Sequence, residues 1–382
     1  MGYWQEVASQ PQAIEILESA TKNASELSHA WLITGPPGSG RSNIAYLFAA
    51  ALIARSTQER ELTYKQVVGR THPDLDVLTT EGSIIKIDDA RRVATRAHYA
   101  PSIGRYRVII AEDADRLPEK SSNTLLKALE EPPERTIWIL CAPSEADMLP
   151  TIRSRTRSLR LQTPSVSDVA GLLIKRDGVE EELAERVARL SQSHIGMARK
   201  LAKDPEALER RTRTLELVLD IRSLSDAMFA ALKISKLAEA DAKQLSEDKD
   251  GFEREEALRM LGVAPGGSVP PKLRGQIRAL EDDQKRRAKR GVKDALDRVL
   301  TDVLSLYRDA ILIKLNAQTA LINEEMRQKL TLLADSVPEE GLLKMITAVE
   351  TARDRLQRGV TPALTIEALF ASVVAVGDGG VR

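Results

Sequence analysis

The segment from Gly35 to Ser42 has the residue types and the spacing of a phosphate-binding loop. Its glycines allow backbone N–H groups to face a phosphate, and a helix that starts directly after the loop adds positive potential. An apolar run, Ala30–Thr34, precedes the loop, and a stretch rich in Ala and Leu follows it. The alternative is an ordinary tight turn between a strand and a helix. The residues predicted to bind nucleotide here are Gly35, Pro36, Pro37, Gly38, Ser39, Gly40, Arg41 and Ser42.

Arg41 departs from the pattern of such loops, which have lysine where the side chain reaches the β- and γ-phosphates. Arginine keeps the positive charge, but its guanidinium is planar and bulkier, so the exchange is not conservative at a point-charge site. The sequence therefore predicts a loop that binds nucleotide without efficient hydrolysis.

A second pair of candidate groups, Glu112 and Asp113, follows the apolar residues 108–111. In P-loop enzymes an acid at this place holds Mg²⁺, and the usual order is Asp before Glu. The reversed order displaces each carboxylate by about one methylene, roughly 1 Å, and misplacements of that size can lower a rate ~10²-fold. ATP or ADP with Mg²⁺ is thus the predicted cofactor, and weak or absent turnover is expected. The equally weighted alternative is that the two acids merely end a strand.

The elements that must position these groups alternate between short apolar runs and helical patterns. The runs expected to form strands are 30–34, 75–78, 107–111 and 136–141. Apolar runs bounded by turn residues, with helices between them, indicate a parallel sheet covered on both faces. The first part of the chain is therefore predicted to be α/β.

The rest of the chain is predicted to be helical, since no convincing strand follows Pro205. Thr361-Pro362 has the N-cap and first-turn residues of a last helix. The interval 247–290 is acidic, then rich in Gly and Pro, then basic, which indicates a mobile or partly helical insertion, with a long solvated helix as the alternative. Residues recur at three-and-four spacing in two largely apolar series, Leu296, Leu300, Val303, Tyr307, Ala310 with Lys314, and Leu342, Ile346, Val349, Ala352 with Leu356.

Composition excludes several classes of protein. In 382 residues, 56 Lys and Arg balance 56 Asp and Glu, which argues against bulk electrostatic capture of nucleic acid. Aromatic residues make up 3%, too few for a platform that stacks single strands. The longest apolar run, 44–54, is shorter than the ~20 residues of a membrane span. One cysteine fits a reducing compartment, so we expect a cytoplasmic protein without a membrane partner.

Two further motifs point to a family. The segment 123–133 reads Asn-Thr-Leu-Leu-Lys-Ala-Leu-Glu-Glu-Pro-Pro, and 149–156 reads Leu-Pro-Thr-Ile-Arg-Ser-Arg-Thr. With the phosphate loop, this combination resembles the clamp-loader branch of the AAA+ family, most closely the delta-prime-type subunits of bacterial DNA polymerase III. The resemblance covers 35–161 well and is diffuse afterwards. It includes His72-Pro73-Asp74, Gly104-Arg105-Tyr106-Arg107, Gly196-Met197-Ala198-Arg199, similar to a second-sensor helix, and Tyr307-Arg308-Asp309 in the expected collar.

The resemblance gives roles to two arginines. It implies that Arg155 is an arginine finger that acts on the ATP site of a neighbouring subunit, with Thr156 in place of the family's cysteine. It also places Arg199 in the nucleotide site. The alternative for Arg155 is a solvated basic run, because arginines crowd the segment 153–160.

The resemblance also implies the domain organisation. It predicts an AAA+ (RecA-like) domain over 1–163, a small helical lid over 164–208, and an all-α collar over 209–376 with a charged insertion at about 236–291. Relatives carry a cysteine zinc knuckle before the His-Pro-Asp element. Because 55–70 contains no cysteine and Cys141 lies in a predicted core strand, no zinc is expected, and His72 is expected to be structural or capping.

The implied function is that of a clamp-loader stator at replication forks. Its partners would be ATP-binding gamma/tau-type subunits, a clamp-opening delta-type subunit, the sliding clamp, and primer-template DNA through the complex. One alternative is an autonomous AAA+ remodelling ATPase on DNA. Another is a DNA-binding adaptor that uses the basic residues 285–290, for which a solvated helix face is the commoner explanation.

Overall fold

The computed structural model describes residues 4, 7, 10–80, 84–260 and 274–379. The chain forms two compact units, which divide between Lys203 and Asp204. We call them unit 1 (residues 1–203) and unit 2 (residues 204–382) and describe each by itself. The finer boundaries expected at 163 and 208 stay predictions.

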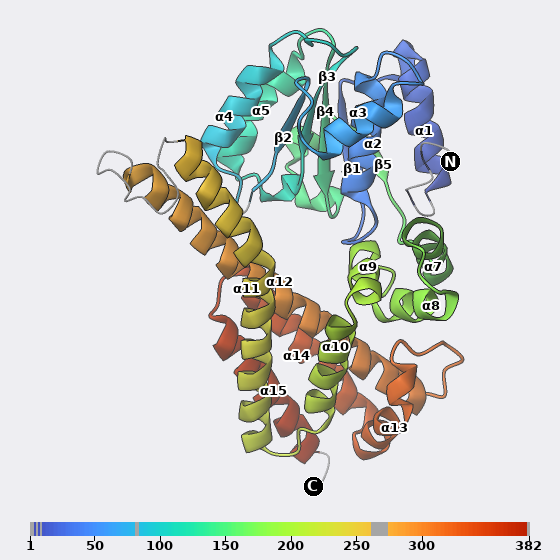
Figure 1. Ribbon diagram of the computed structural model, residues 1–382. Coiled ribbons are helices and arrows are strands. Elements are labelled where there is room, and N and C mark those ends of the chain that lie inside the picture. Colours follow the sequence, from blue (N-terminus) through green and yellow to red (C-terminus); the bar gives the residue numbers. More distant parts are fainter. Residues whose placement is uncertain (1–3, 5–6, 8–9, 81–83, 261–273, 380–382) are drawn as a thin grey trace. The chain divides into compact units, whose positions relative to one another are not determined.

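Unit 1 is built on a five-stranded parallel sheet with the order β2-β3-β4-β1-β5 (Figure 1). All four predicted strands are confirmed, whereas the fifth, β5, was not predicted. Only Leu159 is buried in β5, so this edge strand lacks the apolar run that marks the others. The strands are β1 (Ala30–Thr34), β2 (Leu75–Leu78), β3 (Arg107–Ala111), β4 (Thr136–Ala142) and β5 (Arg157–Arg160).

Helices cover both faces of this sheet, and strand side chains alternate between the two cores (Figure 1). Trp31 and Ile33 of β1 pack with helix α2, whereas Ala30 and Leu32 pack with helices α4 and α5. The chain thus has the predicted α/β P-loop architecture. The helices of this part are α1 (Pro11–Lys22), α2 (Arg41–Ile53), α3 (Arg60–Val68), α4 (Ile87–Ala97), α5 (Glu119–Glu130) and the short α6 (Pro150–Arg153).

Three short helices complete unit 1: α7 (Val166–Leu172), α8 (Glu181–Leu190) and α9 (Ile195–Lys203). Ser165 and Asp168 form a reciprocal capping box at the start of α7. Gly178 has a φ of +67°, the left-handed conformation that glycine adopts at little cost after a helical turn. These helices occupy the segment predicted as the lid.

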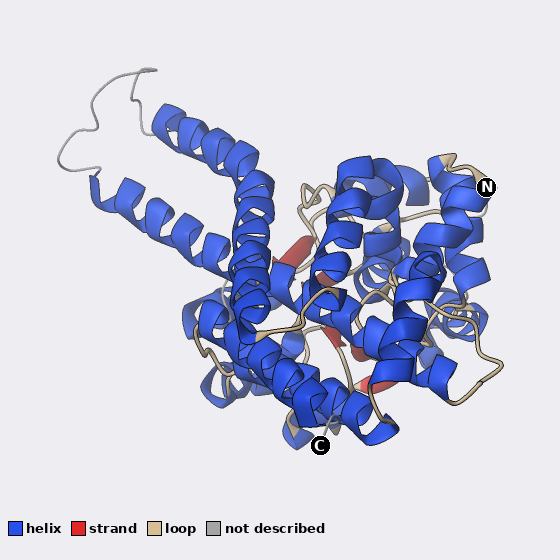
Figure 2. Cartoon of the chain, turned by 90° about the horizontal axis from the view of Figure 1, so that it is seen from below, coloured by secondary structure: helices blue, strands red, loops and turns tan. Residues whose placement is uncertain are grey.

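Unit 2 is entirely helical in the part that the structure describes, which confirms the prediction for that region (Figure 2). The predicted last helix begins at Pro362, as expected. Long helices occupy both ends of the interval 247–290, while 261–273 lie outside the described residues, so the partly helical insertion and the long helix both stay predictions. The helices are α10 (Pro205–Leu219), α11 (Leu224–Met260), α12 (Arg274–Lys314), α13 (Arg327–Ser336), α14 (Glu339–Gln357) and α15 (Pro362–Gly379).

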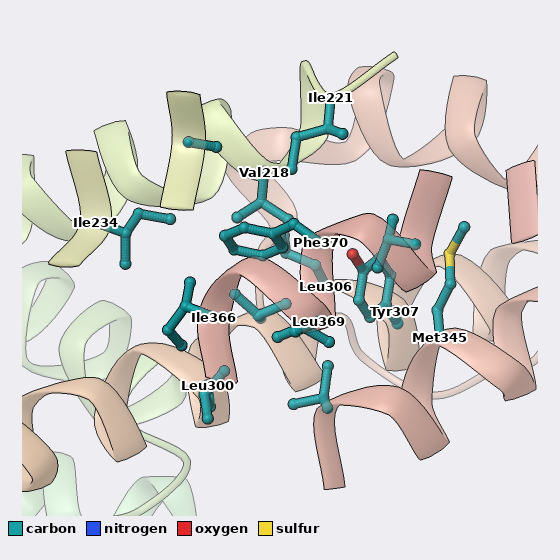
Figure 3. Close-up of a cluster of buried hydrophobic side chains, with 14 of the residues drawn as sticks. Val218, Ile221, Ile234, Leu300, Leu306, Tyr307, Met345, Ile366, Leu369 and Phe370 are labelled. Atoms are coloured by element: carbon teal, nitrogen blue, oxygen red, sulfur yellow. The ribbon is translucent and has the colours of Figure 1, made fainter. Parts of the chain in front are cut away.

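One hydrophobic core joins the helices of unit 2, and Figure 3 shows its centre. Phe370 of α15 and Leu306 of α12 are fully buried there with Val218 of α10. The apolar residues of the two predicted series all face this core, because three-and-four spacing places them on one side of each helix. Within the described residues, no helix is long and apolar enough to cross a membrane.

The His-Pro-Asp and Gly-Arg-Tyr-Arg motifs meet around a buried carboxylate in unit 1. Asp74 accepts hydrogen bonds from the backbone N–H groups of Ser102, Ile103 and Gly104, at 2.5, 2.9 and 2.7 Å. Burial alone would raise the pKa of Asp74, but these hydrogen bonds and the charge of Arg107 outweigh it and hold the pKa below its usual range. The carboxylate therefore fixes the loop before β3.

We predict that Asp74→Asn lowers the free energy of unfolding by about 1.5–3 kcal/mol at neutral pH, because the hydrogen bonds lose their charged acceptor. A carboxyl whose pKa is lower in the folded chain stabilises above its unfolded pKa, and this stabilisation is lost as the pH falls through the folded pKa. The difference between variant and wild type should therefore shrink in acid. Urea unfolding of unit 1 at pH 7 and pH 3 measures it. The exposed Asp88→Asn is the control, and equal effects of both variants would contradict the prediction.

Candidate functional site

The predicted phosphate loop lies between β1 and α2, at the carboxyl end of the sheet, where parallel α/β sheets bind ligands. Gly38 and Gly40 have φ angles of +83° and +90°, a conformation that side chains rarely adopt. The N–H of Gly35 donates to the carbonyl of Pro143, just after β4, at 3.2 Å. The loop therefore has the strand–loop–helix context that the motif requires.

Polar atoms inside this loop are buried without a hydrogen-bond partner in the described structure. They are Oγ of Ser39 and Nη1 of Arg41. Oδ1 of Asp115, a residue whose electrostatic neighbours include Arg41, is in the same condition. Burial and the neighbouring Asp113 raise the pKa of Asp115, against the opposing charge of Arg41. Arg41, a residue of the loop, thus lies near an acid of its own chain, Asp115.

The two acids predicted to serve the nucleotide point to different partners. Glu112 accepts a hydrogen bond from Nη2 of Arg70 at 3.2 Å, and Nε of Arg70 donates to the hydroxyl of Tyr46 at 3.2 Å. Asp113 has a φ of +49° and forms an ion pair with Arg116 at 3.7 Å. The carboxylate of Glu112 is therefore engaged by a cation of its own domain.

The start of α9 lies against the loop. A Cβ atom at Gly38 would lie 2.4 Å from Cγ of His194, so only glycine leaves room for this contact. The N–H of Ile195 donates to the carbonyl of Gly38 at 3.4 Å. Arg199, one turn further, donates instead to Asp177 at 2.9 Å, within the segment predicted as the lid. Its assignment to the nucleotide site stays a prediction.

The predicted finger, Arg155, follows α6 and borders an open cleft of about 660 Å³. Its side chain is 33% exposed. Its neighbour Arg157 is used differently, because the guanidinium lies 4.8 Å from the ring centroid of Trp31 and donates to the carbonyl of Glu26. The basic run is therefore divided into residues with separate roles. The cleft is lined by Ser28, His29, Leu129, Glu130, Ser154, Arg155, Thr156 and Arg157.

Sequence reasoning did not single out three residues that the structure brings to these places. Asp115 lies near Arg41, the side chain of His194 packs against Gly38, and Glu130 forms an ion pair with Arg155. Glu130 stood inside a quoted motif, but a motif does not say which side chain its carboxylate meets. The other two contacts join segments far apart in the chain, so no local pattern could reveal them.

The residues considered for zinc have other surroundings. His72 accepts a hydrogen bond at Nδ1 from the N–H of Asp74 at 3.1 Å, a structural role in the turn that leads into β2. Cys141 is buried in β4, and burial raises the pKa of its thiol to about 12. A thiol is not a metal ligand until it is deprotonated. That no zinc binds stays a prediction.

Two family models match the chain. Residues 9–165 match the family described as "DNA polymerase III, delta subunit", and residues 292–372 match "DNA polymerase III, delta subunit, C terminal". The first match contains the phosphate loop and Arg155, and the second contains much of α12 together with α13 and α14. The two matches thus fall on the α/β part of unit 1 and on the helical unit 2.

Curated relatives carry related names. The chain is 27% identical over 371 residues to a DNA polymerase III subunit gamma/tau of Mycobacterium bovis, covering 88% of this chain and 62% of that protein. It is 26% identical over 219 residues to the delta' subunit of Bacillus subtilis, covering 56% of this chain and 66% of that protein. The chain thus spans less than two thirds of the length of the gamma/tau relative.

A solved structure of a DNA polymerase III gamma subunit-related protein from Thermotoga maritima is similar at 16% identity. The alignment covers 94% of this chain and 99% of that one, with a TM-score of 0.44. The fold class predicted above is confirmed by the parallel sheet of this chain and by the match of its helical C-terminal part.

Proposed function

Since the chain belongs to the clamp-loader family of DNA polymerase III subunits, we propose that it is a delta-prime-type stator. In this proposal it assembles with ATP-binding gamma/tau-type subunits and a clamp-opening delta-type subunit. The assembly loads the sliding clamp onto primed DNA, and this chain meets the primer-template only as part of it. Arg155 serves the ATP site of a neighbouring subunit.

The observation that carries the proposal is the position of Arg155 at a cleft on the protein surface. Phosphate is recognised well by the planar fork of a guanidinium. An arginine supplied in trans stabilises the charge that develops during phosphoryl transfer. A partly exposed arginine just after a short helix is able to reach a phosphate held by another chain.

The chain's own loop supports the stator part of the proposal. Arg41 replaces the lysine of the loop, and the Glu112 carboxylate is paired with Arg70. Both features weaken the binding of a γ-phosphate and its Mg²⁺ by this loop. The intact glycines of the loop, by contrast, favour retention of nucleotide binding, with ATP or ADP as the ligand.

We predict that the isolated chain binds nucleotide weakly and hydrolyses it at a rate at least ~10²-fold below that of the reconstituted loader. Calorimetry with Mg-ATP and Mg-ADP and a steady-state ATPase assay on both preparations measure this. The Ser42→Ala variant is the control for the loop. Robust turnover by the isolated chain that Ser42→Ala abolishes would favour the autonomous ATPase instead.

A further inference from the structure

The guanidinium of Arg155 is bound by hydrogen-bond acceptors of the same chain. Nη1 donates to the carbonyl of Thr151 at 2.7 Å and to Oγ of Ser154 at 3.1 Å. Nη2 forms an ion pair with Oε1 of Glu130 at 2.5 Å. Both terminal nitrogens thus have partners, and of these three partners Glu130 alone carries a negative charge.

The local structure fixes where the carboxylate of Glu130 stands. Glu130 is the last residue of α5, which Pro132 and Pro133 follow closely. The carbonyl of the preceding Leu129 makes a 2.9 Å hydrogen bond with Nε2 of His29, just before β1. The end of α5 is therefore anchored to the sheet on the same cleft that contains Arg155.

We infer that Glu130 is a positioning residue. It holds the guanidinium of Arg155 within its own chain until a nucleoside triphosphate bound to a neighbouring subunit competes for that guanidinium. The inference rests on the proposed function. A carboxylate at 2.5 Å opposes the charge that would attract a phosphate and occupies the nitrogen that would donate to it. The side chains of Arg155 and Glu130 are 33% and 45% exposed, so water screens the pair and it exchanges readily.

The test is the ATPase of the reconstituted loader with the Glu130→Gln variant, measured with and without DNA and clamp. The amide keeps the size of the side chain but removes the competing charge. We expect the unstimulated rate to rise about 2- to 5-fold, the range that corresponds to an exposed ion pair of up to ~1 kcal/mol. The ratio of stimulated to unstimulated rate should fall by the same factor. At higher salt concentration the difference in unstimulated rate between Glu130→Gln and the wild type should become smaller, because salt screens the Arg155–Glu130 pair of the wild type.

Two controls keep the outcomes distinct. Glu131→Gln makes the same change of charge at the next, exposed residue and should leave both rates unchanged. Glu130→Asp keeps the charge and should lie between the wild type and Glu130→Gln. A lower stimulated rate in Glu130→Gln, or rates equal to those of Glu131→Gln, would overturn the inference while Arg155→Ala still tests the proposed function separately. If Arg155→Ala is silent, both are overturned.

Discussion

Replacing Arg155 by alanine should lower the rate of ATP hydrolysis at the partner site that it serves by roughly 10³- to 10⁵-fold, the contribution of an arginine supplied in trans in P-loop enzymes. The physical reason is the loss of a fixed positive charge beside the phosphoryl group as negative charge develops there. Stimulation by DNA and clamp should disappear at that site. Single-turnover hydrolysis in the reconstituted loader, which isolates one site, measures the effect.

Arg153→Ala is the matched control for this experiment. Arg153 lies two residues earlier in the same basic run and is exposed. If the run acted only through its total charge, both alanine variants would have equal and small effects. The Arg155→Lys variant keeps the charge but not the fork, and it should recover only part of the rate. An unchanged rate in Arg155→Ala would refute the finger assignment.

Replacing Asp309 by alanine should lower the free energy of unfolding of unit 2 by about 3–5 kcal/mol. The reason is that the carboxylate is fully buried, so its removal leaves its hydrogen-bond partners unpaired. Asp309 accepts hydrogen bonds from the N–H groups of Ile322 and Asn323 at 3.1 and 2.7 Å and from the side chain of Asn323 at 3.0 Å. It also pairs with Arg308 at 2.7 Å. The carboxylate therefore ties α12 to the segment that leads into α13.

Hydrogen exchange of peptides from α12 and α13 reports on this effect within unit 2 alone, and a fall in midpoint temperature of roughly 6–20 °C should accompany it. Asp335→Ala, at an exposed position of α13, is the control and should change stability by no more than about 0.5 kcal/mol. Asp309→Asn retains one oxygen acceptor and should lose less than Asp309→Ala. Equal protection in the Asp309→Ala variant and the wild type would contradict the prediction.

The strands illustrate how far local pattern reaches. The runs at 30–34, 75–78 and 107–111 were recognisable because both faces of a covered parallel sheet demand continuous apolar residues. β5 escaped because it is an edge strand with one buried side chain among polar residues. β5 pairs with β1, which lies more than 100 residues earlier in the chain, and a four-residue pattern contains no information about so distant a partner.

The amino-acid sequence by itself determined the phosphate loop, the four apolar strands, and the replacement of the loop lysine by Arg41, because each of these follows from residue type and spacing along a short stretch. The tertiary structure alone decided that Glu112 meets Arg70 and that Arg155 meets Glu130. Such pairs join residues separated by whole elements, so they exist only after the helices and strands between them have packed.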